Sequence, residues 1–169
     1  MAVRYRGDLV ALAKYYGTDK WNEHWYAEIY EQHFRELRER PLSILEIGVG
    51  GFDNPQSGGA SLRMWKAYFP NGRIHGIDIH DKKPIEERRI RIWQGSQADP
   101  AFMSGVFAEI GRVDIVIDEM TARVGMVGGL FFRRFIMIFW ARTGLLAIAL
   151  YSGQLHDPDL IWGHMTMDL

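Results

Sequence analysis

The chain has 169 residues, enough for one hydrophobic core and too few for two full domains. Hydrophobic residues make up 47% of the sequence and the formal net charge is −1, so composition argues against a nucleic-acid or anionic-membrane partner. The lack of cysteine excludes disulfides and thiolate metal sites and, with no apolar run at the N-terminus, favours a cytoplasmic location.

The N-terminal segment, residues 1–40, is predicted to be helical. Apolar side chains recur at helical spacing from Leu9 to Tyr16, and Gly17 is expected to end this first helix. A second helix is expected next, and Pro41 limits how far it extends. We therefore expect two short helices before the main part of the chain.

From residue 41 onward, short apolar strands alternate with helices. The predicted strands are residues 42–47, 74–79, 90–93 and 113–118. One intervening helix is expected to be capped by Ser61, and another begins with Asp99 as cap and Pro100 as its first residue. This alternation predicts an α/β fold over residues 41–119, with a parallel Rossmann-like sheet and helices on both faces.

The last segment, residues 120–169, does not continue this alternation. Residues 130–151 are nearly all apolar, but Arg142 lies near the middle of the best window for a membrane span. A charge there is costly in a bilayer, so we expect a buried or poorly fitting core segment and no membrane span. The fold of this apolar tail is left open.

Ligands bind parallel sheets at the carboxyl ends of the strands, and the first two predicted strands end in suitable residues. Glu46 is followed by Gly48 and Gly50, where the missing side chains let backbone amides approach a ligand. The Glu46 carboxylate suits a cationic methionine moiety. Asp78 ends the second strand, where a carboxylate can accept both hydroxyls of a ribose.

The third and fourth predicted strands also end in polar residues. Ser96 and Gln97 follow the third strand and offer polar groups to an adenine edge, and Asp118 and Glu119 end the fourth. Each feature alone is equally typical of a tight turn or a solvated strand end. Four such ends in order predict an S-adenosylmethionine site.

A nicotinamide-binding Rossmann domain is the nearest alternative. Its motif requires Gly-x-Gly-x-x-Gly, a helix that follows closely, and an acid about 20 residues later. Here Gly51 is adjacent to Gly50, the next helix is expected only near Ser61, and Asp78 lies well beyond the required distance. The S-adenosylmethionine interpretation is therefore preferred.

The remaining candidates are interpreted as structural. His75 is predicted to be an ordinary strand residue, and the run from His80 to Lys83 a solvated loop, although it lies beside the expected ribose site.

Four segments together resemble a known family. They are Tyr16–Lys20, Leu45–Gly51, Gly58–Trp65 and Gly76–Asp78. Over about residues 8–119 the chain is similar to the macrolide-sugar O-methyltransferases of the mycinamicin type. This resemblance implies a class I methyltransferase fold, S-adenosylmethionine as methyl donor, magnesium, a sugar hydroxyl of a small molecule or glycolipid as acceptor, and a homo-oligomer.

The resemblance also implies a set of cofactor-binding residues. They are Thr18, Glu46, Gly48, Gly50, Ser61, Asp78, Ser96, Gln97 and Asp118. Thr18 and Ser61 have a simpler alternative, because either hydroxyl could cap a helix.

The resemblance fails after the fourth strand. The family pattern there is Asp-Asp-Gly-Ser-His, in which the second Asp is a metal ligand and the His is the proposed base. This chain has Glu119 at the metal-ligand position, which can still offer an oxygen to magnesium, and Ala122 at the base position, which cannot take a proton. The catalytic base is therefore unassigned, and the sheet is expected to be incomplete at its C-terminal end.

Three hypotheses follow. The chain is a sugar O-methyltransferase, a truncated or frameshifted relative that binds the cofactor but is catalytically impaired, or a noncatalytic subunit that assembles with a partner through its apolar surfaces.

Overall fold

A computed structural model describes residues 5, 7–21, 26–118, 135–140 and 146–151, and only the backbone from residue 118 onward. The helices and strands, in chain order, are α1 (Leu9–Tyr16), α2 (Tyr26–Phe34), the 3-10 turn η2 (Arg35–Leu37), β1 (Ser43–Ile47), α3 (Ala60–Tyr68), β2 (Arg73–Asp78), the 3-10 turn η3 (Lys83–Ile85), β3 (Ile90–Gln94), α4 (Pro100–Ile110), β4 (Ile115–Asp118), β5 (Phe135–Trp140) and β6 (Leu146–Tyr151).

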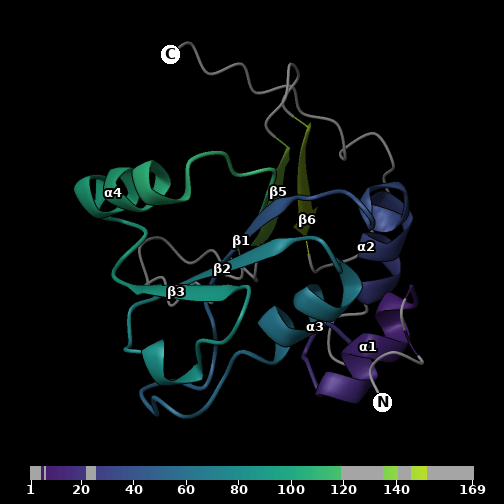
Figure 1. The fold of residues 1–169 in the computed structure, drawn as a ribbon, viewed down its shortest axis with the longest axis horizontal. Helices are drawn as coiled ribbons and strands as arrows, with labels where there is room; N and C mark the ends of the chain where they lie inside the picture. Colours follow the sequence, from purple (N-terminus) through teal and green to yellow (C-terminus); the bar gives the residue numbers. More distant parts are fainter. Residues whose placement is uncertain (1–4, 6, 22–25, 119–134, 141–145, 152–169) are drawn as a thin grey trace, which may run out of the picture.

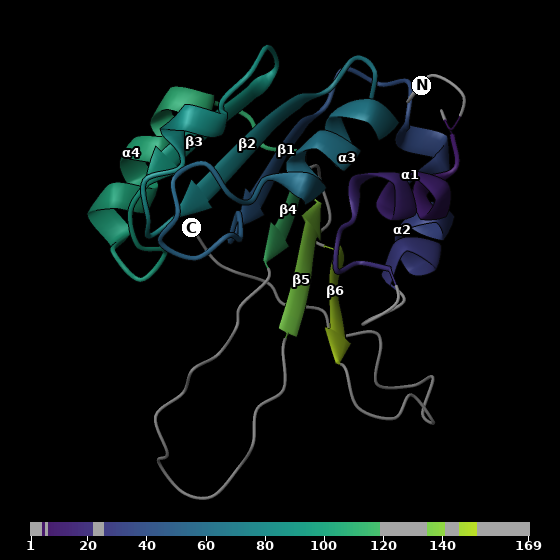
Figure 2. The same ribbon diagram turned by 90° about the horizontal axis from the view of Figure 1, so that it is seen from below.

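The strands form one sheet in the order β3-β2-β1-β4-β5-β6 (Figures 1 and 2). Its first four strands are parallel, since β1 pairs with β2 and β4 and β2 pairs with β3 in parallel register. The predicted parallel α/β core is thus confirmed. Because β1 lies between β2 and β4, the chain crosses over the sheet after β3, which makes the β1–β4 boundary its topological switch point.

The apolar tail contributes two further strands, β5 and β6 (Figure 2). β5 pairs with β4 in antiparallel register, and β6 pairs with β5 in the same way. The parallel part of the sheet therefore ends at β4 in the described part of the chain. None of the helices in that part combines the length and the apolar character needed to cross a bilayer.

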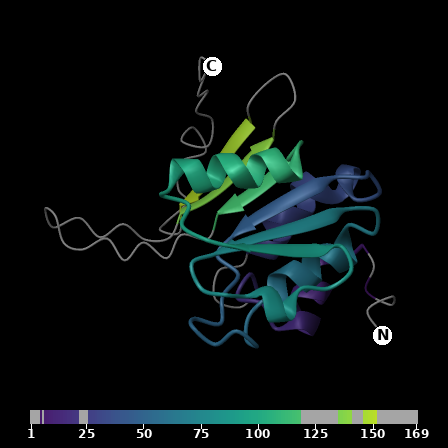
Figure 3. The same cartoon turned by 60° about the vertical axis from the view of Figure 1, so that its left-hand side comes forward.

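The two faces of the sheet are covered by different helices (Figure 3). Alternate strand residues such as Ile44 and Ile74 pack against α1, α2 and α3, whereas Leu45 and Ile77 pack against α4. This follows from the two-residue period of a strand, which sends successive side chains to opposite faces. Burying each large aliphatic side chain stabilises the fold by roughly 1.5–3 kcal/mol.

Two of the predicted helix ends are confirmed by the structure, and a third is wrong. Gly17 ends α1 with φ of 66°, and Asp99 caps α4 by accepting the amides of Ala101 and Phe102, as predicted. The predicted cap at Ser61 is wrong. Gly59 occupies the cap position of α3 with φ of 71°, so Ser61 lies inside the helix and its hydroxyl points elsewhere.

The N-terminal helices share a core with the sheet. Tyr30 and Phe34 of α2 contact Trp65 of α3 edge to face, and all three belong to the cluster that includes Ile44 of β1. The predicted division of the chain at residues 40 and 119 stays a prediction.

Candidate functional site

The residues Gly48–Gly51, here called the glycine turn, follow β1 and lie against the end of β2. The Gly48 amide donates to the Ile77 carbonyl oxygen at 2.8 Å, and Gly48 and Gly50 have φ of 92° and 77°, a region that favours glycine. A Cβ atom added at Gly50 would have no neighbour within 4 Å. The backbone at Gly50 is therefore open to an approaching ligand.

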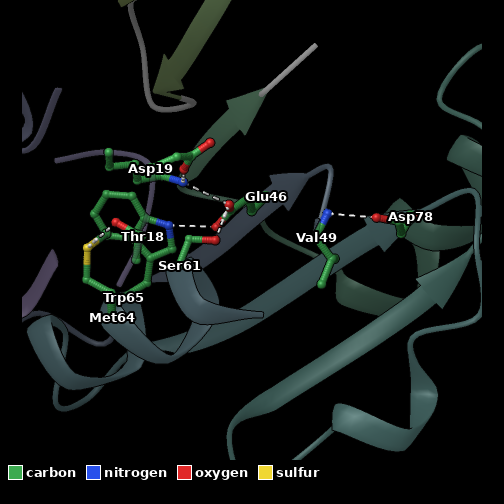
Figure 4. Close-up of polar contacts among 9 residues, drawn as sticks. Thr18, Asp19, Glu46, Val49, Ser61, Met64, Trp65 and Asp78 are labelled. Carbon is green, nitrogen blue, oxygen red and sulfur yellow. Dashed lines mark hydrogen bonds and ion pairs between the residues drawn. The ribbon is translucent and has the colours of Figure 1, made fainter. Parts of the chain in front are cut away.

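Asp78 is joined to this turn by its carboxylate. Oδ2 accepts the Val49 amide at 2.9 Å (Figure 4), and Oδ1 accepts the His80 amide at 2.9 Å. The side chain is partly exposed. Each carboxylate oxygen has a second lone pair, so Asp78 can still accept hydroxyl donors while it holds the turn.

Glu46 has a different environment, although it precedes the turn by only two residues. Its side chain is fully buried. Oε1 accepts Lys20 Nζ at 3.1 Å and the Ser61 hydroxyl at 2.5 Å, and Oε2 accepts Trp65 Nε1 at 2.7 Å (Figure 4). Glu46 thus points into the helix layer behind the turn, and its role as a cofactor ligand stays a prediction.

Lys20 is the partner that sequence reasoning missed. Its side chain is also fully buried, and its ammonium lies 3.1 Å from Glu46 and 3.9 Å from Asp19. The pair links the segment after α1 to β1. This link is costly to break, because removing either member would leave an uncompensated charge in the core. The signal was present, because Lys20 ends the first of the four segments that carry the family resemblance.

Thr18 and Ser61 do not cap helices. Both are buried, Thr18 Oγ1 donates to Met64 Sδ at 3.9 Å, and Ser61 donates to Glu46. Both hydroxyls are therefore hydrogen-bonded behind the glycine turn, and their direct contact with a cofactor stays a prediction.

Ser96 and Gln97 follow β3 beside Asp78. The Gly95 amide donates to the Asp78 carbonyl oxygen at 2.8 Å, which ties this segment to the end of β2. Both side chains are half-buried, and Ser96 Oγ accepts the Ala98 amide at 3.2 Å. The structure thus brings the ends of β1, β2 and β3 together at one edge.

The fourth strand end is described only in part. Asp118 is in register with Ile47, which places its backbone at the same edge of the sheet. Glu119 and Ala122 lie outside the described residues. Within the described ranges, no group of three His, Asp or Glu side chains could hold a metal ion.

The prediction of a solvated loop after β2 is wrong for Lys82, whose side chain is fully buried. It is right for His80, Asp81 and Lys83, which are exposed. His75 lies on β2 as expected, but both ring nitrogens are buried without a hydrogen-bond partner. Desolvation by burial lowers the pKa of His75 to about 4, with the nearby charges of Arg73 and Arg91 acting in the same direction.

These residues fit an adenosyl cofactor. The open backbone at Gly50 can receive the methionine end, and the partly exposed Asp78 carboxylate, held beside the turn by the Val49 amide, can receive ribose hydroxyls. Ser96 and Gln97 are within the segment that adjoins Asp78.

The fold is that of a class I methyltransferase. The structure matches MycE methyltransferase from the mycinamycin biosynthetic pathway, crystallised with Mg and SAH, with a TM-score of 0.64 and 46% identity over 67% of this chain. A second solved structure of MycE, with the same TM-score and identity, also contains mycinamycin VI.

Curated relatives give the same result. The chain is 49% identical over 114 residues to 8-demethyl-8-(2-methoxy-alpha-L-rhamnosyl)-tetracenomycin-C 3'-O-methyltransferase of Streptomyces olivaceus. It is 47% identical over 113 residues to mycinamicin VI 2''-O-methyltransferase of Micromonospora griseorubida. No protein-family profile matches.

The similarity is confined to part of each protein. It covers 67% and 66% of this chain and 29% and 28% of these two relatives, so the chain spans less than a third of their length. The C-terminal part of the chain is unmatched. The predicted resemblance to sugar O-methyltransferases over about two thirds of the chain is thus confirmed.

Proposed function

We propose that this chain binds S-adenosylmethionine at the carboxyl edge of its parallel strands and is the donor-binding part of a sugar O-methyltransferase. The acceptor is a sugar hydroxyl of a glycosylated natural product or glycolipid. One observation carries the proposal: the Asp78 carboxylate holds the Val49 amide beside the open backbone of Gly50. The names of the similar proteins support the choice of acceptor.

Bound S-adenosylmethionine would supply the methyl group. The chain's own residues would fix its position, with Asp78 accepting ribose hydroxyls and the amides of the glycine turn lying along the methionine end. Glu46, fixed by three donors from Lys20, Ser61 and Trp65, would keep the turn in this shape. Fixing one reactant in this way lowers the entropic part of the barrier to transfer.

We also propose a magnesium ion at the site where the acceptor hydroxyl reacts. Glu119 would offer a carboxylate oxygen to magnesium, which would lower the cost of generating the acceptor alkoxide. A homo-oligomer and a cytoplasmic location stay predictions.

Calorimetric titration with S-adenosylmethionine and with SAH tests the donor site. We expect saturable binding to the wild-type chain and an affinity lower by about tenfold for Asp78→Asn, which loses a charged acceptor. Lys83→Met, an exposed substitution nearby, is the matched control and should bind as wild type does. No binding at millimolar ligand would contradict the proposal and favour a noncatalytic interaction subunit.

A second candidate is a chain that binds the donor without turnover. Ala122, at the position where the family resemblance expects a histidine base, favours it. Transfer of labelled methyl groups from S-adenosylmethionine to a rhamnosylated or macrolide acceptor, with and without magnesium, separates the two. Turnover supports the first proposal, and binding without turnover supports the second.

A further inference from the structure

Residues 50–58, the middle of the connection between β1 and α3, form a loop that folds tightly on itself. A Cβ atom added at Gly51 would lie 2.3 Å from the Ser57 carbonyl oxygen, and one added at Gly58 would lie 2.3 Å from the Gly50 carbonyl oxygen. The Ser57 amide donates to the Asn54 carbonyl at 3.1 Å. The two ends of the loop therefore meet next to the open backbone of Gly50.

Lys82 reaches this loop from the segment after β2. Its Nζ donates to the carbonyl oxygens of Asn54 at 2.8 Å and Ser57 at 3.1 Å, and its side chain is fully buried. An ammonium so removed from water is stable only if its protons are accepted, and here backbone carbonyls accept them. The carbonyl groups of Asn54 and Ser57 are therefore both directed toward the Lys82 ammonium.

A second contact joins the same two segments. Ile85 is buried, and its Cδ1 lies 2.8 Å from the position of a Cβ atom added at Gly59, so the two residues are closely packed, and the φ of 71° at Gly59 favours glycine there. The Ile85 amide donates to the Lys82 carbonyl at 3.1 Å, which holds the two residues in one turn. The segment that follows Asp78 is thus packed onto the loop that follows the glycine turn.

We propose that Lys82 is a positioning residue for the donor site. Its ammonium organises residues 50–58 from inside the loop and fixes them relative to the segment that begins at Asp78. These contacts set the spacing between the methionine and ribose ends of the proposed donor site. The inference rests on the proposed function, because the quantity it affects is affinity for the adenosyl cofactor.

Lys82→Met keeps most of the side-chain volume and removes the charge and its donors. We expect affinity for SAH, measured by calorimetry, to fall about tenfold or more, as for loss of a charge-assisted hydrogen bond. Hydrogen–deuterium exchange without cofactor should accelerate in residues 50–59 and stay unchanged in α4. Lys83→Met, the adjacent exposed lysine, should change neither quantity.

A chemical rescue separates positioning from a general packing role. The chain contains no cysteine, so Lys82→Cys introduces a single thiol. Alkylation of the unfolded variant with 2-bromoethylamine, followed by refolding, restores an ammonium on a chain of lysine length. Alkylation with iodoacetamide gives a neutral control. We expect the aminoethylated protein to recover SAH affinity and slow exchange in the loop, and the neutral adduct to recover neither.

Three failures are distinguishable. If the wild-type chain binds SAH and Lys82→Met binds it equally well, Lys82 has no positioning role although the proposed function stands. If both chemical adducts bind equally well, side-chain volume rather than charge organises the loop, and the proposal is wrong. If the wild-type chain itself does not bind SAH, the proposed function fails and this inference fails with it.

Discussion

Two carboxylates at the same edge of the sheet have opposite surroundings. Glu46, one residue before the end of β1, is fully buried, and both of its oxygens accept side-chain donors from the loop after α1 or from α3. Asp78 ends the adjacent strand β2 partly exposed, with backbone amides as its partners. Position near a strand end therefore does not by itself assign a role to a carboxylate. Burial and the kind of donor decide whether a carboxylate supports a site or faces a ligand.

The largest effect on stability is expected from breaking the buried ion pair between Lys20 and Glu46. Lys20→Met leaves the Glu46 charge without its cationic partner in the core, so we expect the free energy of unfolding to fall by about 3–5 kcal/mol. Urea denaturation measures it. The double variant Lys20→Met with Glu46→Gln should lose less than the sum of the two single variants, because it removes the uncompensated charge. Strict additivity would contradict the coupling.

His75 differs from both carboxylates, because its ring nitrogens are buried without hydrogen-bond partners. Its folded-state pKa of about 4 lies below the ordinary value of 6.5, so the unfolded chain binds a proton more readily between these two pH values. Stability should therefore fall as the pH drops from about 6.5 toward 4, by roughly 2–3 kcal/mol in total.

Urea denaturation at several pH values tests this expectation. His75→Phe should lose the part of the pH dependence that lies in this window, while His80→Gln, at an exposed position, should retain it. An unchanged profile in His75→Phe would show that other groups cause the acid sensitivity.

Trp65→Phe tests one hydrogen bond of the buried network. The indole Nε1 donates to Glu46 Oε2 at 2.7 Å, and phenylalanine keeps part of the ring packing while removing the donor. We expect a loss of about 1–3 kcal/mol in unfolding free energy. Trp93→Phe is the control, since its indole bond to Glu109 is exposed and 3.3 Å long. Equal losses in both variants would argue that ring volume alone matters.

Asp78→Asn should have the smallest effect on stability and a clear effect on binding. The side chain is partly exposed and the amide oxygen can still accept the Val49 amide, so unfolding free energy should change by less than about 1 kcal/mol. Denaturation and SAH titration of the same sample compare the two quantities. A large loss of stability would place Asp78 in the same class as Glu46.

Local patterns were enough to predict the parallel fold and the sheet edge. Apolar runs gave the four strands, and Asp99 with Pro100 gave the start of α4, because capping and strand periodicity depend on neighbours in sequence. The Lys20–Glu46 pair joins residues 26 positions apart, and the Lys82 contacts join residues 25 and 28 apart. Lysines in polar runs resemble solvated residues, so their burial depends on tertiary packing that no local pattern records.

The direction of the Glu46 side chain was unpredictable for the same reason. Strand alternation places it on one of two faces, but Ser61 and Trp65 take their positions only when α3 packs on that face. Ser61 satisfied the sequence rule for a helix cap and instead became a buried donor, because Gly59 takes the cap position of α3.

We propose that the chain binds the adenosyl donor between the glycine turn and Asp78. Titration of an isotopically labelled chain with SAH, followed through its backbone amide NMR signals, tests it most directly. We expect saturable shifts concentrated at Gly48–Gly51, Asp78–Ile79 and Gln94–Gln97, with α4 unaffected beyond its first turn. Shifts confined to other surfaces, or no shifts at millimolar SAH, would contradict it.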